Sequence, residues 1–193
     1  MKKLIPVNIY AEVTPNPLVM KFVVDKVINK SDIVEYKSVK EAKDCPLAIE
    51  LFNFPFIKEI FIAKNYISIY KYDLVEWEDI TLEIKDFLRN YIQQGKPFFT
   101  NVPRKKPVIK NTAPKNEIDG KIIAILNEHV KPAVEMDGGN IEFHSYKNGV
   151  VSLVLQGACS GCPSSTITLK SGIEQLLKKL LPNQITDVVA ING

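Results

Sequence analysis

The chain has 193 residues, of which 46% are apolar and 24% are charged, and its formal net charge is +3. This length suits one large domain or two small ones, and the composition is that of an ordinary globular protein. It excludes a collagen-like chain, a disulfide-dense scaffold and a chain that is disordered throughout. No apolar run approaches the ~18 residues that span a bilayer. The first residues predict neither a secretory signal nor a transit peptide, so we expect no membrane partner.

The positive charge is concentrated in one segment, residues 95–116, which holds six basic residues, no acid and four of the twelve prolines. Proline prevents both helix continuation and sheet pairing, so we expect an extended, solvated linker here. Nucleic-acid binding by a basic domain face is therefore not expected. The triplet Arg104-Lys105-Lys106 could contact an anionic partner weakly, but a linker kept in water is the favoured interpretation.

Residues 1–94 show mixed helical and strand patterns and form the first predicted domain. Alternating or β-rich runs predict strands over 7–11, 20–24, 33–39, 59–63 and 66–72, with a turn at 14–17. A short helix is expected over 46–52, because proline is favoured in the first helical turn. A longer helix follows from the apolar spacing of Ile80, Ile84, Leu88 and Tyr91. Trp77, just before it, is expected to pack in the core.

Residues 117–193 form the second predicted domain, in the order helix, strand, strand, helix, strand. A helix beginning near Ile118 should kink at Pro132 and stop at Asp137-Gly138-Gly139-Asn140. Strands over 141–146 and 150–155 flank Asn148-Gly149, a strong hairpin signal. A helix over 169–180 and a strand over 185–191 complete the unit. We therefore expect an α+β protein of two small α/β domains, with a mixed N-terminal sheet and two C-terminal helices on one sheet face.

Glycine and histidine usage excludes several kinds of chemistry. All nine glycines lie at Gly95 or later, and neither of the two common glycine-rich phosphate loops occurs. Nucleotide cofactors bound by those loops are excluded. The two histidines, His129 and His144, are both expected at the surface, on a helix and on the polar side of a strand, rather than as metal ligands. No catalytic residue is predicted.

Three cysteines occur, and the odd count without a secretion signal argues against a disulfide framework. A reducing setting follows, and we expect a cytoplasmic location. Cys45 stands alone before the short helix at 46–52. It is expected to be a buried structural residue without chemistry.

The remaining two cysteines, Cys159 and Cys162, form a CxxC motif between a predicted strand and a predicted helix. This spacing lets two sulfurs converge on one metal ion or cluster. Pro163 opens the following helix, so free N–H groups and the positive end of its dipole should face the sulfurs. We expect this environment to favour thiolate over thiol and to favour an anionic metal–sulfur unit.

A lone CxxC leaves four interpretations open. A thioredoxin-like redox pair is disfavoured, because only about 31 residues follow the motif and that fold needs further strands. Structural zinc needs four ligands, which a dimer could supply as four thiolates. An iron–sulfur cluster is likewise held by four thiolates, two from each of two chains. Inert packing is the fourth interpretation, and it suits a glycine-containing loop at a helix start least.

Four stretches of the C-terminal half together resemble the C-terminal NifU domain of Nfu-type iron–sulfur cluster scaffold and carrier proteins. They are VKPAV (130–134), MDGGNI (136–141), LQGACSGCPSS (155–165) and TLKSGIE (168–174). The N-terminal half is similar to the Nfu N-terminal domain through TPNP (14–17), MKF (20–22), PLA (46–48) and LF (51–52). The resemblance covers nearly the whole chain except the linker.

The resemblance implies that Cys159 and Cys162 bind a labile cluster, of the [4Fe–4S] type, between two subunits, with the [2Fe–2S] type left open by the sequence. It implies that upstream assembly proteins supply the cluster and that apo iron–sulfur proteins receive it. The chain is then a carrier, a homodimer when loaded, and not an enzyme. The alternative is a thiol–disulfide oxidoreductase or a zinc-binding protein that uses the same two sulfurs.

Overall fold

The computed structural model describes residues 6–29, 33–100, 114, 116–160 and 163–192. The chain divides into two compact units, residues 1–104 and 105–193, and each is described by itself. The predicted domains 1–94 and 117–193 stay a prediction, and so does the predicted linker 95–116 beyond residue 100. The basic triplet at 104–106 lies outside the described residues.

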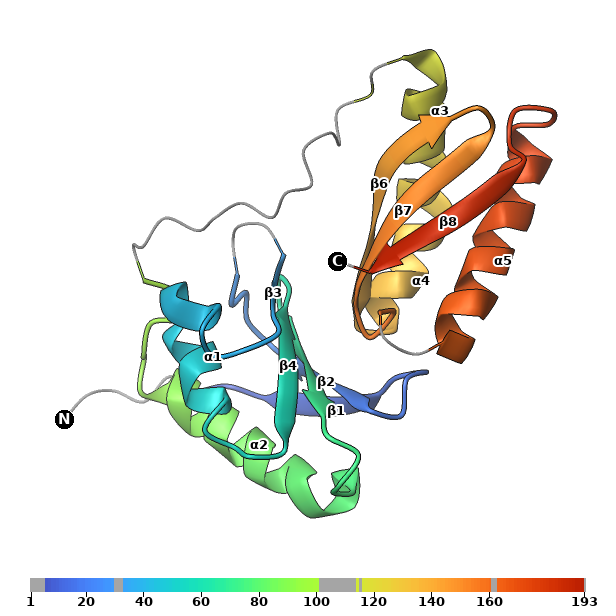
Figure 1. The fold of residues 1–193 in the computed structure, drawn as a ribbon. Coiled ribbons are helices and arrows are strands. Elements are labelled where there is room, and N and C mark those ends of the chain that lie inside the picture. Colours follow the sequence, from blue (N-terminus) through green and yellow to red (C-terminus); the bar gives the residue numbers. More distant parts are fainter. Residues whose placement is uncertain (1–5, 30–32, 101–113, 115, 161–162, 193) are drawn as a thin grey trace. The chain divides into compact units, whose positions relative to one another are not determined.

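The first unit is built on a five-stranded sheet with the order β1-β2-β5-β4-β3 (Figure 1). Its strands are β1 (Ile9–Val13), β2 (Val19–Val24), β3 (Val34–Tyr36), β4 (Ile57–Ile62) and β5 (Tyr66–Lys71). All five predicted strands are present, although β3 is only three residues long. Every neighbouring pair is antiparallel, where a mixed sheet was expected.

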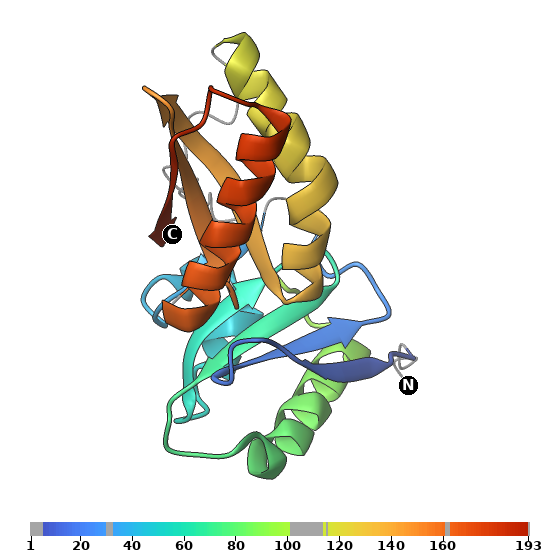
Figure 2. The ribbon, with the colours of Figure 1, turned by 90° about the vertical axis from the view of Figure 1, so that its right-hand side faces the viewer.

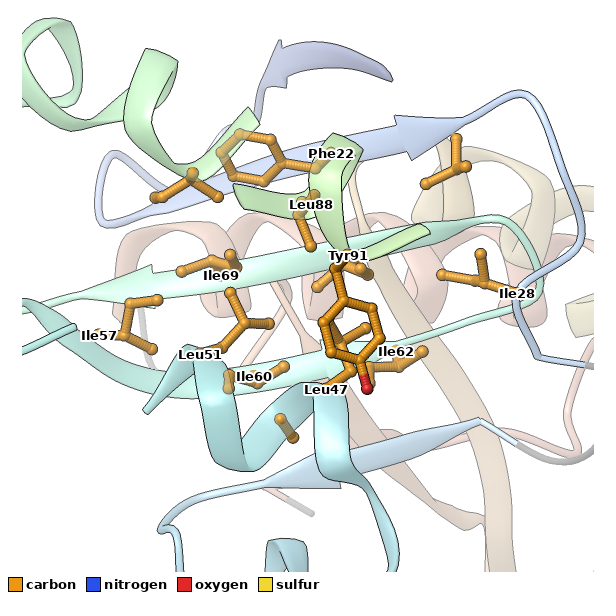
Figure 3. Close-up of a cluster of buried hydrophobic side chains, with 14 of the residues drawn as sticks. Phe22, Ile28, Leu47, Leu51, Ile57, Ile60, Ile62, Ile69, Leu88 and Tyr91 are labelled. Atoms are coloured by element: carbon orange, nitrogen blue, oxygen red, sulfur yellow. The ribbon is translucent and has the colours of Figure 1, made fainter. Parts of the chain in front are cut away.

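Two helices pack against this sheet and form the core of the first unit. They are α1 (Pro46–Leu51) and α2 (Trp77–Gln93), and a short 3₁₀ turn, η1 (Ala42–Asp44), precedes α1. Figure 3 shows Leu47 and Leu51 of α1 and Leu88 and Tyr91 of α2 directed at the isoleucines of β4 and β5. Trp77 packs at the edge of this core, and its Nε1 donates to the Pro17 carbonyl over 2.9 Å, which ties α2 to the turn after β1.

The residues that follow α2 are attached to the first unit. Tyr91 Oη donates to the Pro97 carbonyl at 2.6 Å, and Lys96 pairs with Glu50 at 3.1 Å. The Thr100 amide donates to the Asp44 carbonyl at 2.8 Å, and both phenylalanines at 98 and 99 pack against the core. Residues 96–100, which the sequence placed at the start of a solvated linker, therefore pack as part of the first unit.

The second unit has the predicted order of elements. It comprises α3 (Glu117–Ile125), a π-helical turn η2 (Leu126–Val130), α4 (Lys131–Met136), β6 (Gly139–Lys147), β7 (Val150–Gly157), α5 (Pro163–Leu180) and β8 (Asp187–Asn192). β6 and β7 are antiparallel, whereas β7 and β8 are parallel. The helices lie on one face of this sheet, as Figure 2 shows, and the α+β class is confirmed.

Local sequence explains the breaks in the second unit. The π-helical turn ends at Val130, so the irregular turn sits where Pro132 withholds an N–H from the helix. Gly138 follows α4 with φ +81°, the left-handed conformation that ends many helices. Asn148 and Gly149 both have positive φ and close the β6–β7 hairpin. Among the described residues, no helix has the length and apolar character that a membrane span requires.

Candidate functional site

Cys159 lies in the turn that joins β7 to α5, two residues after the last residue of β7, Gly157. Its side chain is buried, with 7% of its surface exposed, and belongs to the core cluster of the second unit. Cys162, the predicted second ligand, lies outside the described residues. The structure therefore defines one half of the predicted sulfur pair and the elements that hold it.

The sulfur of Cys159 rests directly on the backbone of Gly139, the first residue of β6. A Cβ placed on Gly139 would lie 2.6 Å from Cys159 Sγ and 2.8 Å from the Gln156 carbonyl oxygen. Real side-chain carbons do not approach so closely, so only glycine fits under the sulfur. We call this contact of Cys159 Sγ with the Gly139 backbone the seat of Cys159. The two residues are 20 positions apart in the sequence, and the hairpin of β6 and β7 brings them together.

Hydrogen bonds around Cys159 fix the turn on both sides. The Ala158 amide donates to the Gly138 carbonyl at 3.3 Å, and the Ser160 amide donates to the Gly157 carbonyl at 2.8 Å. Ser160 Oγ also donates to that carbonyl, at 2.9 Å, and Thr166 Oγ1 in α5 donates to the Cys159 carbonyl at 3.3 Å. The turn that carries the cysteine is thus linked to the loop after α4, to β7 and to α5.

The electrostatic environment of Cys159 differs from the one expected at the start of a helix. Burial, and after it the negative charge of the nearby Asp137 carboxylate, raises the pKa of the Cys159 thiol to about 12. The expectation that the helix terminus favours thiolate is therefore wrong for Cys159 in the chain as it stands. Desolvation of the buried sulfur and the negative charge of Asp137 both disfavour the thiolate.

The rate of Cys159 alkylation should therefore rise tenfold per pH unit through pH 10 and 11 without reaching a plateau. At neutral pH the thiolate fraction is about a thousandfold lower than for a thiol of pKa 9. We would measure iodoacetamide reaction rates in a chain carrying Cys45→Ala and Cys162→Ala. A plateau near pH 9 would contradict the raised pKa.

The same shift makes the folded state less stable in alkali. The unfolded thiol releases its proton near pH 9, whereas the folded thiol holds it to about 12. The contribution of Cys159 is fully present below pH 9 and is lost as the pH rises towards 12. Asp137→Asn should reduce this loss, because it removes one of the two causes.

A buried polar pair lies at the same end of the sheet as the seat. Asn140 Nδ2 donates to Gln156 Oε1 at 3.0 Å and to Glu142 Oε1 at 3.2 Å. Asn140 is completely buried and Gln156 is 6% exposed. The two residues are direct cross-strand partners, one rung from the pair formed by Gly139 and Gly157.

The third cysteine has a structural role, as expected. Cys45 is fully buried in the core of the first unit, and its Sγ accepts a hydrogen bond from the Ala48 amide at 3.4 Å. It occupies the position before α1 where a side chain satisfies a free backbone N–H of the first helical turn.

The two histidines differ in their surroundings. His129 is exposed on η2, as predicted. His144 is half-buried at a β-bulge between Phe143 and Ser145, which shifts the alternation that the sequence pattern assumed. Tyr146 consequently packs against the core rather than beside Glu142. Within the described part of the chain, no three His, Cys, Asp or Glu side chains gather as metal ligands.

Several features of this site were not found from the sequence. The local pattern of Asp137-Gly138-Gly139-Asn140 predicts a helix stop, and the stretch also carries part of the family resemblance. Neither indicates that it supplies the charge beside the sulfur, the glycine beneath it and the amide next to it. The signal that could have found the seat is the second glycine, since one left-handed residue is enough to end a helix.

Two family descriptions match this chain, one in each unit. "Scaffold protein Nfu/NifU N terminal" matches residues 9–95, and "NifU-like domain" matches residues 122–189. The second match contains the seat, the buried polar pair and the CxxC motif.

Similar proteins include NifU-like protein 4, mitochondrial, of Arabidopsis thaliana, which is 33% identical over 88% of this chain and 61% of its own length. The NFU1 iron-sulfur cluster scaffold homolog, mitochondrial, of Drosophila willistoni is 34% identical over 88% of this chain and 58% of its own. NifU-like protein C1709.19c of Schizosaccharomyces pombe is 32% identical over 95% of this chain and 72% of its own. The chain spans about three fifths of the length of the first two.

The expected cytoplasmic location is wrong, because these first two relatives are named as mitochondrial proteins and point away from the cytoplasm. The expectation depended on reduced cysteines, and free thiols are compatible with any reducing compartment. The number of cysteines therefore does not identify the cellular compartment of the protein.

Proposed function

Because the chain belongs to the Nfu/NifU-like family of scaffold proteins, we propose that it holds a labile iron–sulfur cluster and passes it to apo-proteins. Cys159 and Cys162 are the ligands, and the cluster is a [4Fe–4S] cube shared by two copies of the chain. Upstream assembly proteins supply it and apo iron–sulfur proteins receive it. In this role the chain carries cargo and catalyses no reaction.

The observation that carries the proposal is the seat of Cys159 on Gly139. Hydrogen bonds to Gly138 after α4, to Gly157 in β7 and from Thr166 in α5 hold the turn that carries Cys159. Its sulfur is therefore a pre-positioned soft ligand, and soft thiolates suit iron–sulfur clusters. The glycine lets this sulfur pack directly against the β6 backbone, which fixes its position from one side.

The raised pKa of Cys159 supports a labile cargo. A thiol must lose its proton to bind iron, so every pKa unit above the ambient pH costs about 1.4 kcal/mol of the binding free energy. A protein that must release its cluster gains from such weakened binding, whereas a permanent cofactor site does not. Asp137 contributes to the weakening through its negative charge.

Ligand counting supports the sharing of the cluster between two chains. A cubane cluster takes four thiolates, and one CxxC motif supplies two. Cys45 is buried in the other unit as a helix cap, so it is committed elsewhere. Two motifs related by a two-fold axis complete the set without any further residue.

The surface around the loop supports contact with another protein. Met136, next to Asp137, is 73% exposed, and Ile167, next to Thr166, is 63% exposed. Both neighbour residues that act directly on Cys159. Exposed apolar side chains that flank a ligand loop are suited to a second copy of the chain or to a recipient.

The same pKa argues against the alternative of a thiol–disulfide oxidoreductase. Such enzymes attack with a thiolate whose pKa is lowered, and here burial raises the pKa of Cys159. The zinc alternative needs four ligands as well, so it predicts the same two-chain geometry but no sulfide.

Loading with cluster should convert monomers into dimers, and chelation of the iron should reverse the change. Binding free energy that depends on two chains appears as assembly linked to loading. Anaerobic light scattering before and after chelation, with iron measured per chain, tests this. A loaded monomer with four irons would contradict the shared site.

A further inference from the structure

The two faces of the β6–β7 ladder carry different chemistry where it meets the cysteine turn. Successive strand residues point to opposite faces, so Gly139 and Ile141 face the helices and Asn140 faces away from them. Gly139 pairs with Gly157, and Asn140 pairs with Gln156. The seat of Cys159 thus lies on the helix-facing side of the ladder, at the pair Gly139–Gly157. The amide pair Asn140–Gln156 is the neighbouring pair and lies on the opposite side.

The amide pair connects the two strands by side chains as well as by backbone. Asn140 Nδ2 bonds Gln156 across the ladder and Glu142 along β6. The bond across the ladder joins β6 to β7 beside the backbone pairing of the same two residues. Such a connection restrains sliding or splaying of the strands at that rung.

The close packing at the seat makes the position of the Cys159 sulfur depend on how β6 and β7 are aligned. With Cys159 Sγ and the Gln156 carbonyl oxygen so close to Gly139, a shift of β6 against β7 moves the surface under the sulfur directly. Gln156 contributes to both structures, through its carbonyl to the seat and through its side chain to the amide pair.

We propose that Asn140 and Gln156 form a polar clamp that positions Cys159 for cluster binding. The inference rests on the proposed function for its purpose, but the clamp itself is a property of the chain without cluster. Both residues are positioning residues and touch neither iron nor sulfide. Loss of the clamp should loosen the cysteine turn more than it loosens the rest of the unit.

The test compares Asn140→Ala with a double swap, Asn140→Gln with Gln156→Asn, in the full chain. The swap exchanges a short and a long amide between directly opposed positions, so it can rebuild the same bond. Ser145→Ala is the matched control, because Ser145 lies farther along the same strand and pairs with Ser152 on β7. Amide hydrogen exchange of Ala158 and Ser160 reports on the turn, and that of Leu177 in α5 reports on the core.

Asn140→Ala should speed exchange at Ala158 and Ser160 about tenfold relative to Leu177, the effect of losing one or two hydrogen bonds. The swap should return both amides to within about twofold of the unmodified chain, and Ser145→Ala should leave them unchanged. In cluster-loaded protein, the rate of iron loss to a chelator should be highest for Asn140→Ala, and the swap and Ser145→Ala should lose iron about as slowly as the unmodified chain. Equal acceleration at all three amides, or a folded swap that restores nothing, would overturn the clamp.

Two outcomes separate this inference from the proposed function. A chain that takes up no cluster refutes the proposed function. The ratio of amide exchange at Ala158 and Ser160 to that at Leu177 still shows whether the clamp exists. If Asn140→Ala does not fold, the swap decides alone: exchange like that of the unmodified chain supports the clamp, and fast exchange confined to the turn overturns it.

Discussion

Cys159→Ala and Cys162→Ala should each abolish cluster assembly, with iron and acid-labile sulfide falling to background. Each substitution removes one thiolate per chain, and the two-fold site therefore loses two of its four ligands. No other thiol can compensate, because Cys45 is fully buried in the first unit. Iron and sulfide per chain after anaerobic reconstitution measure the effect.

Cys45→Ala is the control for that loss. It removes the acceptor that caps α1, so the free energy of unfolding should fall by about 1–2 kcal/mol. Cluster content should nevertheless stay at the level of the unmodified chain, since the cap lies in the other unit. A large drop in iron for the folded Cys45→Ala chain would contradict the assignment of Cys45 as structural.

Gly139→Ala should lower the free energy of unfolding by about 3 kcal/mol and abolish or greatly reduce cluster retention. The added carbon would overlap Cys159 Sγ and the Gln156 carbonyl, and a backbone oxygen cannot rotate away as the tip of a long side chain can. Either the sulfur leaves its position or β6 shifts from β7. Urea unfolding and iron per chain measure the two effects.

Gly172→Ala is the matched control, because a Cβ on Gly172 meets nothing within 4 Å. Gly172 is exposed in α5, where alanine favours the helix by about 0.5–1 kcal/mol. This variant should be slightly more stable and should load normally. Equal tolerance of Gly139→Ala and Gly172→Ala would show that the sulfur does not depend on its seat.

Most elements of the fold could be predicted because their patterns are local. The apolar spacing of α2, the prolines at 132 and 163 and the Asn148-Gly149 hairpin act within a few residues, and each is found where it was expected. Local patterns could not predict the register in which β6 and β7 pair. The bulge at His144 adds one residue to β6 and moves Tyr146 to the core side, which no alternation rule anticipates.

The candidate site was only half predictable for the same reason. The CxxC spacing identified the sulfurs, but the environment of Cys159 comes from Asp137 and Gly139 on the preceding strand and helix end. A pKa depends on burial and on neighbours in space, so the helix-start argument predicted the opposite direction. The attachment of residues 96–100 through Pro97 and Thr100 is also non-local and was missed.

Mössbauer spectroscopy of the full chain after anaerobic reconstitution with iron and sulfide tests the central claim most directly. The proposed shared cube predicts about two irons and two sulfides per chain, in the single spectral pattern of a [4Fe–4S] cluster. Iron bound without sulfide, or a chain that retains zinc and forms no cluster under these conditions, would contradict it.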